Sequence, residues 1–192
     1  MKKVFIIALV LVFTIALLAF AVQDLKYELG KKVTGLTLKD HDGKDFDLEK
    51  VLADENTKGV VFIFISCVCP DSRGYDERYV KYAADFKKNG ILLVGINANY
   101  NETVEEMSAY AKEKNYNFTI LKDWNNIIAD RFNATRTPEV FFIDKNSVLR
   151  YKGRIDDNTR DASLVKDHTL VNVMGEYLAG KELSVTETRA VG

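Results

Sequence analysis

The chain has 192 residues, and its 27 basic and 28 acidic side chains give a formal net charge of −1. This balance argues against a nucleic-acid partner, which requires a basic surface to meet the phosphates. Hydrophobic residues make up 47% of the chain and only two residues are proline, so a folded globular protein is expected. We predict a leader over residues 1–22, followed by one domain with a single core over residues 23–192.

The first residues have the pattern of an export leader. Lys2 and Lys3 precede an uncharged, almost wholly apolar run over residues 4–22, in which Ala19-Phe20-Ala21 is a small-x-small cleavage site. The run is longer than a usual signal-peptide core and approaches the ~20 residues that span a bilayer, so a cleaved signal peptide and a retained membrane anchor both remain open. Because lysines precede the run, the domain is expected outside the cytoplasm, in the periplasm or another extracytoplasmic space where disulfides persist.

The first half of the domain predicts a hairpin, a strand, a helix and a second strand. Asp40-His41-Asp42-Gly43 is a turn sequence between alternating apolar residues, as in a β-hairpin. Residues 59–66 are a continuous β-branched and aromatic run, which indicates a strand buried on both faces. Apolar positions three and four apart predict a helix over residues 71–89 that Gly90 ends, and residues 91–97 predict another buried strand.

The second half predicts more helices and a second hairpin. Thr103 and Glu106 have the spacing of a capping box, so a helix is expected over residues 103–114. The remaining predicted elements are a short helix at 124–132, strands at 140–144 and 148–154, and a final helix at 161–179 that Gly180 ends.

This order predicts an α/β fold in which helices flank a central mixed β-sheet. Strand–helix–strand units close with a right-handed crossover, which makes the two buried strands parallel neighbours. The late strand pair adds an antiparallel hairpin. Ligands of such folds bind at the carboxyl ends of the parallel strands, and the two cysteines of the chain lie at such an end.

Cys67 and Cys69 stand at the predicted junction between strand and helix. The helix N-terminus directs its partial positive charge and its unpaired N–H groups toward Cys69, and Pro70 suits the first helical position. These features favour the thiolate, which is the attacking species in thiol chemistry. The junction is therefore the predicted reactive site.

The C-x-C spacing allows the two thiols to react with each other. In an extended segment, residues i and i+2 face the same side, so the two sulfurs can meet. A bridge across one residue would be a tight, strained ring, and strained bridges are the more reducible ones. The competing interpretations are two buried cysteines that act as small apolar side chains, and a zinc site for which no local histidine supplies the missing ligands.

Three segments carry a family resemblance in the expected order. They are LGKKVTGLTLKDHDGK at residues 29–44, FISCVCPDSRGYDERY at 64–79, and TRTPEVFFID at 135–144 followed by LRYKGRIDDN. Together they resemble the thioredoxin-like superfamily and, within it, the redoxin group of peroxiredoxin-like (AhpC/TSA-type) proteins and thiol–disulfide oxidoreductases. The resemblance implies a thioredoxin-like fold and an oxidoreductase. We expect no bound cofactor and no metal.

The resemblance also implies roles for individual residues. Cys69 matches the nucleophile, and Ser72 stands where the second cysteine of the usual C-x-x-C pair would be. Cys67 is then the candidate resolving thiol; alternatively, a small thiol or another protein resolves Cys69. Thr137 and Pro138 match the cis-proline loop that faces the cysteine and binds the partner's backbone. The residues expected to bind substrate are Ser66, Pro70, Ser72, Thr137 and Pro138.

Reduction of peroxide is a competing function. Ser66 precedes Cys69 by three residues, like the peroxiredoxin hydroxyl that helps to hold a peroxide, but the peroxiredoxin arginine aligns with Pro138. Arg73 and Arg136 lie nearby in sequence, and neither matches the motif. Exchange with protein disulfides or dithiols, with an external thiol as reductant, is therefore the favoured prediction.

A copper-binding or docking module is the non-enzymatic alternative. Two thiolates form a soft site that could hold Cu(I). The sequence has only two histidines, His41 and His168, and both are expected on the solvated surface. The histidine that precedes the late strand in thioredoxin-fold copper chaperones is replaced here by Arg136-Thr137-Pro138.

Overall fold

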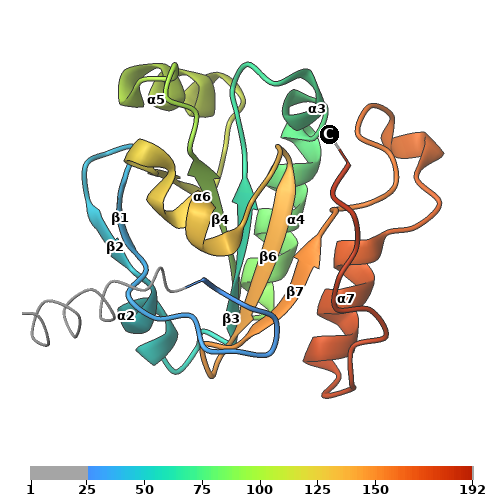
Figure 1. Cartoon of the computed structure of the whole chain (residues 1–192). Helices are drawn as coiled ribbons and strands as arrows, with labels where there is room; N and C mark the ends of the chain where they lie inside the picture. Colours follow the sequence, from blue (N-terminus) through green and yellow to red (C-terminus); the bar gives the residue numbers. More distant parts are fainter. Residues whose placement is uncertain (1–25, 192) are drawn as a thin grey trace, which may run out of the picture.

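The computed structural model describes residues 26–191, so the predicted leader at 1–22 lies outside the described residues. These residues form one seven-stranded sheet with the order β2-β1-β5-β4-β3-β6-β7 (Figure 1). Its strands are β1 (Thr37–Asp40), β2 (Asp45–Asp47), β3 (Gly59–Phe64), β4 (Ile91–Asn97), β5 (Thr119–Lys122), β6 (Glu139–Asp144) and β7 (Leu149–Gly153). Within residues 26–191, no helix has the length and apolarity needed to cross a membrane.

The strand directions confirm the predicted mixed sheet. Strands β3, β4 and β5 are parallel neighbours, and the pairing of β3 with β4 runs from Gly59 opposite Ile91 to Phe64 opposite Ile96. Strand β6 pairs antiparallel with β3, and β7 with β6. At the other side, the β1–β2 hairpin joins the sheet through an antiparallel contact with β5. The carboxyl ends of the three parallel strands therefore meet at one edge.

Helices cover both faces of this sheet (Figure 1). They are α2 (Leu48–Ala53), α3 (Pro70–Arg73), α4 (Asp76–Lys88), α5 (Val104–Glu113), α6 (Ile127–Phe132) and α7 (Thr169–Leu178), with 3-10 turns η1 (Trp124–Asn126) and η2 (Ala162–Leu164). Apolar side chains of α4, α5 and α7 pack in one core cluster, whereas those of α2 and α6 pack in another. Within β6, Phe142 belongs to the first cluster and Phe141 to the second, because successive residues of a strand face opposite sides.

Several predicted elements differ from those of the structure. The helix predicted over residues 71–89 is divided at Gly74, where an added Cβ would lie 2.2 Å from the carbonyl oxygen of Thr159. The predicted helix at 161–179 is wrong over its first eight residues, since α7 begins at Thr169. Residues 161–168 hold only the turn η2, because Val165 is extended and the N–H of Lys166 donates to the Asp157 carboxylate at 2.9 Å in place of a helical carbonyl. Helix α2 and strand β5 were not predicted.

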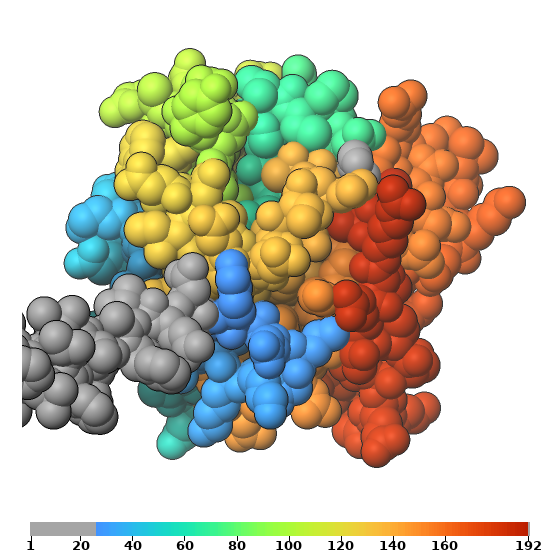
Figure 2. Space-filling model, viewed as in Figure 1, coloured from blue at the N-terminus to red at the C-terminus, as the bar shows by residue number. Residues whose placement is uncertain are grey.

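The C-terminal segment protects the outer strand β7. The N–H of Lys152 donates to the carbonyl of Thr186, and the N–H of Thr188 donates to the carbonyl of Lys152, both at 3.0 Å. Figure 2 shows this segment in red along the surface of the molecule. The backbone N–H and carbonyl of Lys152 on this edge are thus paired within the chain and are not open to another strand.

Candidate functional site

The predicted cysteine loop lies at the carboxyl end of β3 and leads into α3. Cys69 is the N-cap residue of α3 in extended conformation, and Pro70 begins the helix. The thiol of Cys69 donates to the carbonyl oxygen of Thr137 at 3.4 Å. The peptide bond between Thr137 and Pro138 is cis, as the family resemblance implied. The fold thus brings together two predicted parts of the site that are 68 residues apart in the sequence.

Ser66 organises the backbone of the loop. Its hydroxyl oxygen accepts the N–H groups of Val68 at 3.3 Å and Cys69 at 3.2 Å, and its proton is donated to the carboxylate of Glu102. Ser72 supports the loop from α3, since its hydroxyl oxygen accepts the N–H of Ser66 at 3.1 Å. Both serines are buried. Their hydroxyl groups are therefore committed to the loop itself.

Cys67 has different surroundings from Cys69. Its side chain packs against the core cluster that α4 covers, and its N–H donates to Glu102 at 2.7 Å. Burial strongly raises the pKa of the Cys67 thiol, and a hydrogen bond to the Glu102 carboxylate raises it further. Cys67 is thus protonated at neutral pH. Neither cysteine is in a disulfide.

Glu102, which the sequence analysis did not identify, is the centre of a buried hydrogen-bond network. Its carboxylate accepts the Ser66 hydroxyl, the Cys67 N–H at 2.7 Å, and the side-chain amides of Asn97 and Asn99, both at 2.8 Å. Burial alone would raise the pKa of Glu102, but these hydrogen bonds outweigh it and hold the pKa below its usual value. The sequence contains a signal for this network. Asn97 ends the buried strand β4, and Asn99 and Glu102 follow it, at the edge of the sheet where ligands bind in such folds.

Lys122 adds the positive charge of this network. Its ammonium group donates to the side chain of Asn97 at 3.1 Å and to the carbonyl oxygens of Asn99 at 2.5 Å and Glu102 at 2.7 Å. Burial lowers the pKa of Lys122, and the negative charge of Glu102 opposes this effect. The network therefore holds one ionised carboxylate directly beneath the cysteine loop.

A hollow of about 380 Å³ opens beside Cys69. Its lining includes Ser66, Val68, Cys69, Ala129, Arg136 and Thr137. Of the two nearby arginines, Arg136 lines this hollow, whereas Arg73 lines another that contains neither cysteine. The thiol of Cys69 is thus accessible to a partner that also contacts Arg136 and Thr137.

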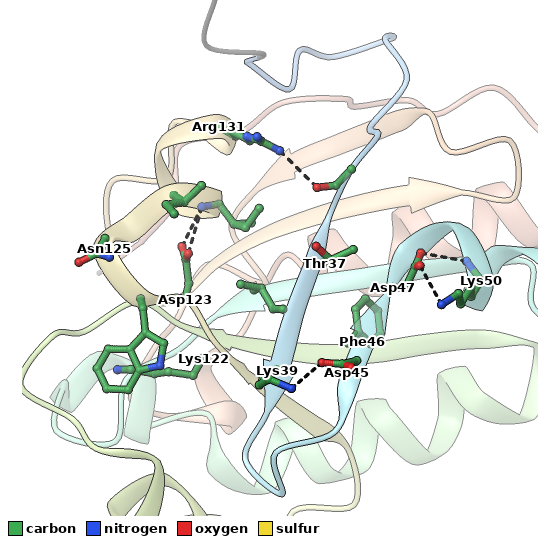
Figure 3. A pocket seen from close by; sticks show the side chains of 15 residues that line it. Thr37, Lys39, Asp45, Phe46, Asp47, Lys50, Lys122, Asp123, Asn125 and Arg131 are labelled. Atoms are coloured by element: carbon green, nitrogen blue, oxygen red, sulfur yellow. Dashed lines mark hydrogen bonds and ion pairs between the residues drawn. The ribbon is translucent and has the colours of Figure 1, made fainter. Parts of the chain in front are cut away.

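A larger hollow of about 750 Å³ lies between the β1–β2 hairpin and the η1–α6 segment (Figure 3). The ammonium nitrogen of Lys122 lies 4.7 Å from the centroid of the Trp124 ring. Neither cysteine lines this hollow. Lys122 connects this hollow with the cysteine loop, because it lines the hollow and also donates hydrogen bonds to Asn97 and Glu102. Within residues 26–191, no group of three or more His, Cys, Asp or Glu residues is placed to hold a metal ion.

Comparison with known proteins identifies the family. A sequence model described as the AhpC/TSA family matches residues 29–152, which is most of the chain. The chain belongs to the AhpC/TSA family. Membership supports a thiol-dependent oxidoreductase, in agreement with the resemblance found in the sequence. No curated protein sequence matches the chain.

Solved structures support the thioredoxin-like fold of this AhpC/TSA protein. A hypothetical protein from Sinorhizobium meliloti 1021 is 30% identical with a TM-score of 0.76, and the match covers 87% of this chain and 93% of that one. An uncharacterized conserved protein from Geobacillus kaustophilus is 26% identical with a TM-score of 0.75, covering 85% and 88%. A secreted disulfide oxidoreductase of Mycobacterium tuberculosis, homologous to DsbE of Escherichia coli, is 24% identical with a TM-score of 0.51, covering 59% and 79%. The predicted fold is confirmed.

Proposed function

We propose that this AhpC/TSA protein is an extracytoplasmic thiol–disulfide oxidoreductase whose nucleophile is Cys69. The observation that carries the proposal is the contact of the Cys69 thiol with the Thr137 carbonyl, beside the cis bond to Pro138 and at an open hollow. A partner polypeptide that enters the hollow would meet the thiol and the Thr137 backbone together. The apolar run at residues 4–22 supports export, either as a cleaved signal or as an anchor for the domain at 23–192.

The reaction consists of two thiol–disulfide exchanges. The thiolate of Cys69 attacks one sulfur of a partner disulfide; a mixed disulfide forms, and the other partner sulfur leaves as a thiolate and takes a proton. Cys67 then attacks the sulfur of Cys69, which closes a Cys67–Cys69 disulfide and releases the partner as a dithiol. An external thiol reductant restores both cysteines.

The contacts of Ser66 favour disulfide exchange over peroxide reduction. The Ser66 hydroxyl donates its proton to Glu102 and accepts two N–H groups of the loop, so its proton is not available to a peroxide at Cys69. Arg136 favours the peroxidase alternative, because it lines the same hollow as Cys69. Stopped-flow mixing with hydrogen peroxide separates the two functions: thiol loss no faster than that of free cysteine is expected for a disulfide oxidoreductase.

Replacement of the nucleophile tests the proposal directly. In a turbidity assay, we expect the intact chain to accelerate the reduction of insulin disulfides by dithiothreitol and Cys69→Ser to give only the rate of dithiothreitol alone, because no thiol remains at the hollow. Cys67→Ser keeps the nucleophile and loses the resolving thiol, so with insulin and no dithiothreitol it should accumulate a mixed disulfide between Cys69 and the substrate that mass spectrometry detects. Unchanged insulin reduction by Cys69→Ser would refute the assignment of the nucleophile.

A further inference from the structure

Helix α6 separates the two hollows described above. Ala129 and Asp130 line the smaller hollow at Cys69, whereas Ile127 and Arg131 line the larger hollow beside the β1–β2 hairpin (Figure 3). The two hollows therefore lie on opposite sides of one short helix. A polypeptide bound at Cys69 has only this helix to cross in order to reach the larger hollow.

Apolar side chains from two segments line the larger hollow. Leu38 and Phe46 come from the β1–β2 hairpin, and Trp124, Ile127 and Ile128 come from the η1–α6 segment. Trp124 and Ile127 are each 53% exposed. Single exposed apolar side chains are common, but exposed apolar side chains that gather in a hollow indicate a binding surface. Tryptophan is also among the residues that contribute most to binding when a partner covers them.

The charged side chains around the larger hollow already have partners within the chain. The contacts are Lys39 with Asp45 at 2.7 Å, Lys50 with Asp47 at 3.4 Å, Arg131 with the Gly35 carbonyl at 3.3 Å, Asp123 with the N–H of Ala129 at 2.8 Å, and Lys122 with the Glu102 carbonyl at 2.7 Å. Figure 3 shows the first two pairs beside the hollow. None of these lining residues is left with an unpaired charge for a charged ligand, whereas an apolar group gains free energy by leaving water.

The width of α6 determines which part of a partner reaches the larger hollow. A helix with its side chains is about 10–12 Å across, which about three residues of extended chain span at ~3.3–3.6 Å each. We propose that the larger hollow is a second subsite for the substrate polypeptide and binds an apolar, preferably aromatic, side chain about three residues from the cysteine that Cys69 attacks. This inference rests on the proposed function. It makes the substrate an unfolded or flexible polypeptide, because only such a chain exposes an extended segment with an apolar side chain beside its disulfide.

Peptides with one activated cysteine test the subsite. Each nine-residue peptide carries its central cysteine as a mixed disulfide with thionitrobenzoate, and has either phenylalanine or serine three residues to each side of that cysteine. The thiolate of Cys69 attacks the peptide sulfur and forms a disulfide with it, and thionitrobenzoate, the better leaving group, departs with the electron pair. Stopped-flow absorbance of the full chain gives the rate. We expect the phenylalanine peptide to react about tenfold faster than the serine peptide, because its ring is buried in the hollow.

Substitutions in the larger hollow should remove this preference. Trp124→Ala and Ile127→Ala should each lose most of the advantage of the phenylalanine peptide, and Trp124→Phe, which keeps a ring, should retain part of it. Leu164→Ala is the matched control for Ile127→Ala and should keep the full advantage, because Leu164 is also an exposed aliphatic side chain and lines neither hollow. The reagent 5,5′-dithiobis(2-nitrobenzoate) has no peptide chain to cross α6 and should react equally with all these proteins.

Equal rates for the two peptides with the intact chain would overturn the subsite, as would an advantage that persists in both Trp124→Ala and Ile127→Ala or that is lost equally in Leu164→Ala. If Trp124→Ala also slows the reagent without a peptide, loss of the contact with Lys122 has altered the cysteine loop, and Ile127→Ala, which leaves that contact in place, decides.

Two further results have separate meanings. A dimer of the intact chain in sedimentation that Ile127→Ala dissociates would assign the larger hollow to a second copy of the chain and overturn its role as a substrate subsite. Release of thionitrobenzoate by Cys69→Ser as fast as by the intact chain would instead refute the proposed function, since Cys69 would then not be the nucleophile.

Discussion

The thiols of Cys67 and Cys69 are separated by one residue but lie in different environments. Cys69 lines an open hollow and donates to the Thr137 carbonyl, whereas Cys67 packs against the core and contacts Glu102. The bend at Cys67 and Val68 accounts for this divergence, since the extended geometry that would place residues i and i+2 on one side is interrupted there. Neither thiol is bridged to the other, although only one residue separates them.

This difference predicts selective alkylation. Iodoacetamide reacts with thiolates, and burial and the Glu102 carboxylate raise the pKa of Cys67. Because a raised pKa keeps the thiol protonated, Cys67 should react at least ~10-fold more slowly than Cys69 at neutral pH, and its rate should still increase with pH beyond the ordinary thiol range. Peptide mass mapping after timed labelling measures both rates. In urea-unfolded protein the two cysteines should react equally, and equal rates in the folded protein would contradict the prediction.

A buried ion pair joins the helix after the cysteine loop to the segment after β7. Arg78 of α4 donates to Asp156 at 2.7 Å, and the hydroxyl of Tyr75 donates to the other Asp156 oxygen at 2.5 Å. Arg78 also donates to the carbonyl of Thr159, the oxygen that leaves no room for a Cβ at Gly74. These contacts fix the break between α3 and α4 and hence the position of α3 beneath Cys69.

Loss of one partner should therefore destabilise the fold strongly. We expect Asp156→Asn to lower the free energy of unfolding by about 3–5 kcal/mol, because it leaves the buried Arg78 charge uncompensated. The matched control is Asp85→Asn, which removes an ion pair with Lys88 whose side chains are half or more exposed, and which should cost less than about 1 kcal/mol. Urea denaturation followed by circular dichroism measures both. Similar losses for the two variants would show that the buried pair contributes no more than a surface pair.

Sequence patterns predicted the elements whose structure depends on residues close together in the sequence. The Thr103–Glu106 capping box and the two buried strands before and after the first long helix are present as expected. The break at Gly74 was not predictable, because it depends on Thr159, which is distant in the sequence. The helix predicted at 161–168 is absent because the N–H of Lys166 donates to the Asp157 carboxylate and not to a helical carbonyl, a contact that periodicity does not detect.

In the candidate site, too, sequence motifs identified some residues, whereas contacts between distant segments determine the role of others. Cys69 and the Thr137–Pro138 bond were identified from motifs, and the fold places them in contact. Glu102 was missed because its role depends on the parallel pairing of β3 with β4, which brings two loops together. The sequence shows only polar residues after a buried strand, a pattern that is common to many loops.

At the scale of the whole molecule, two core clusters share one sheet. Strand β6 contributes Phe141 to the cluster under α6 and Phe142 to the cluster under α4. Both rings are fully buried. Because the same backbone supports both clusters, neither cluster can lose its strands without exposing the other. The described residues should thus unfold as one cooperative unit.

Truncation of either ring tests this cooperativity. Phe141→Ala and Phe142→Ala should each lower the free energy of unfolding by about 3–5 kcal/mol, a large part of the ~5–15 kcal/mol typical of a domain. Trp124 is the only tryptophan and lies by the α6 side, whereas Tyr75, Tyr79 and Tyr82 belong to the cluster under α4. Tyr27 is buried on the α6 side, so the variants are made in a Tyr27→Phe chain, where tryptophan fluorescence and the tyrosine signal in near-ultraviolet circular dichroism report on different faces. Both signals should change at the same urea concentration in each variant, and Leu164→Ala, an exposed position, should shift neither. If the tyrosine transition precedes the tryptophan transition in Phe142→Ala alone, the two faces unfold independently. The sheet would then not couple the core cluster that contacts Cys67 to the α6 side of the hollow at Cys69.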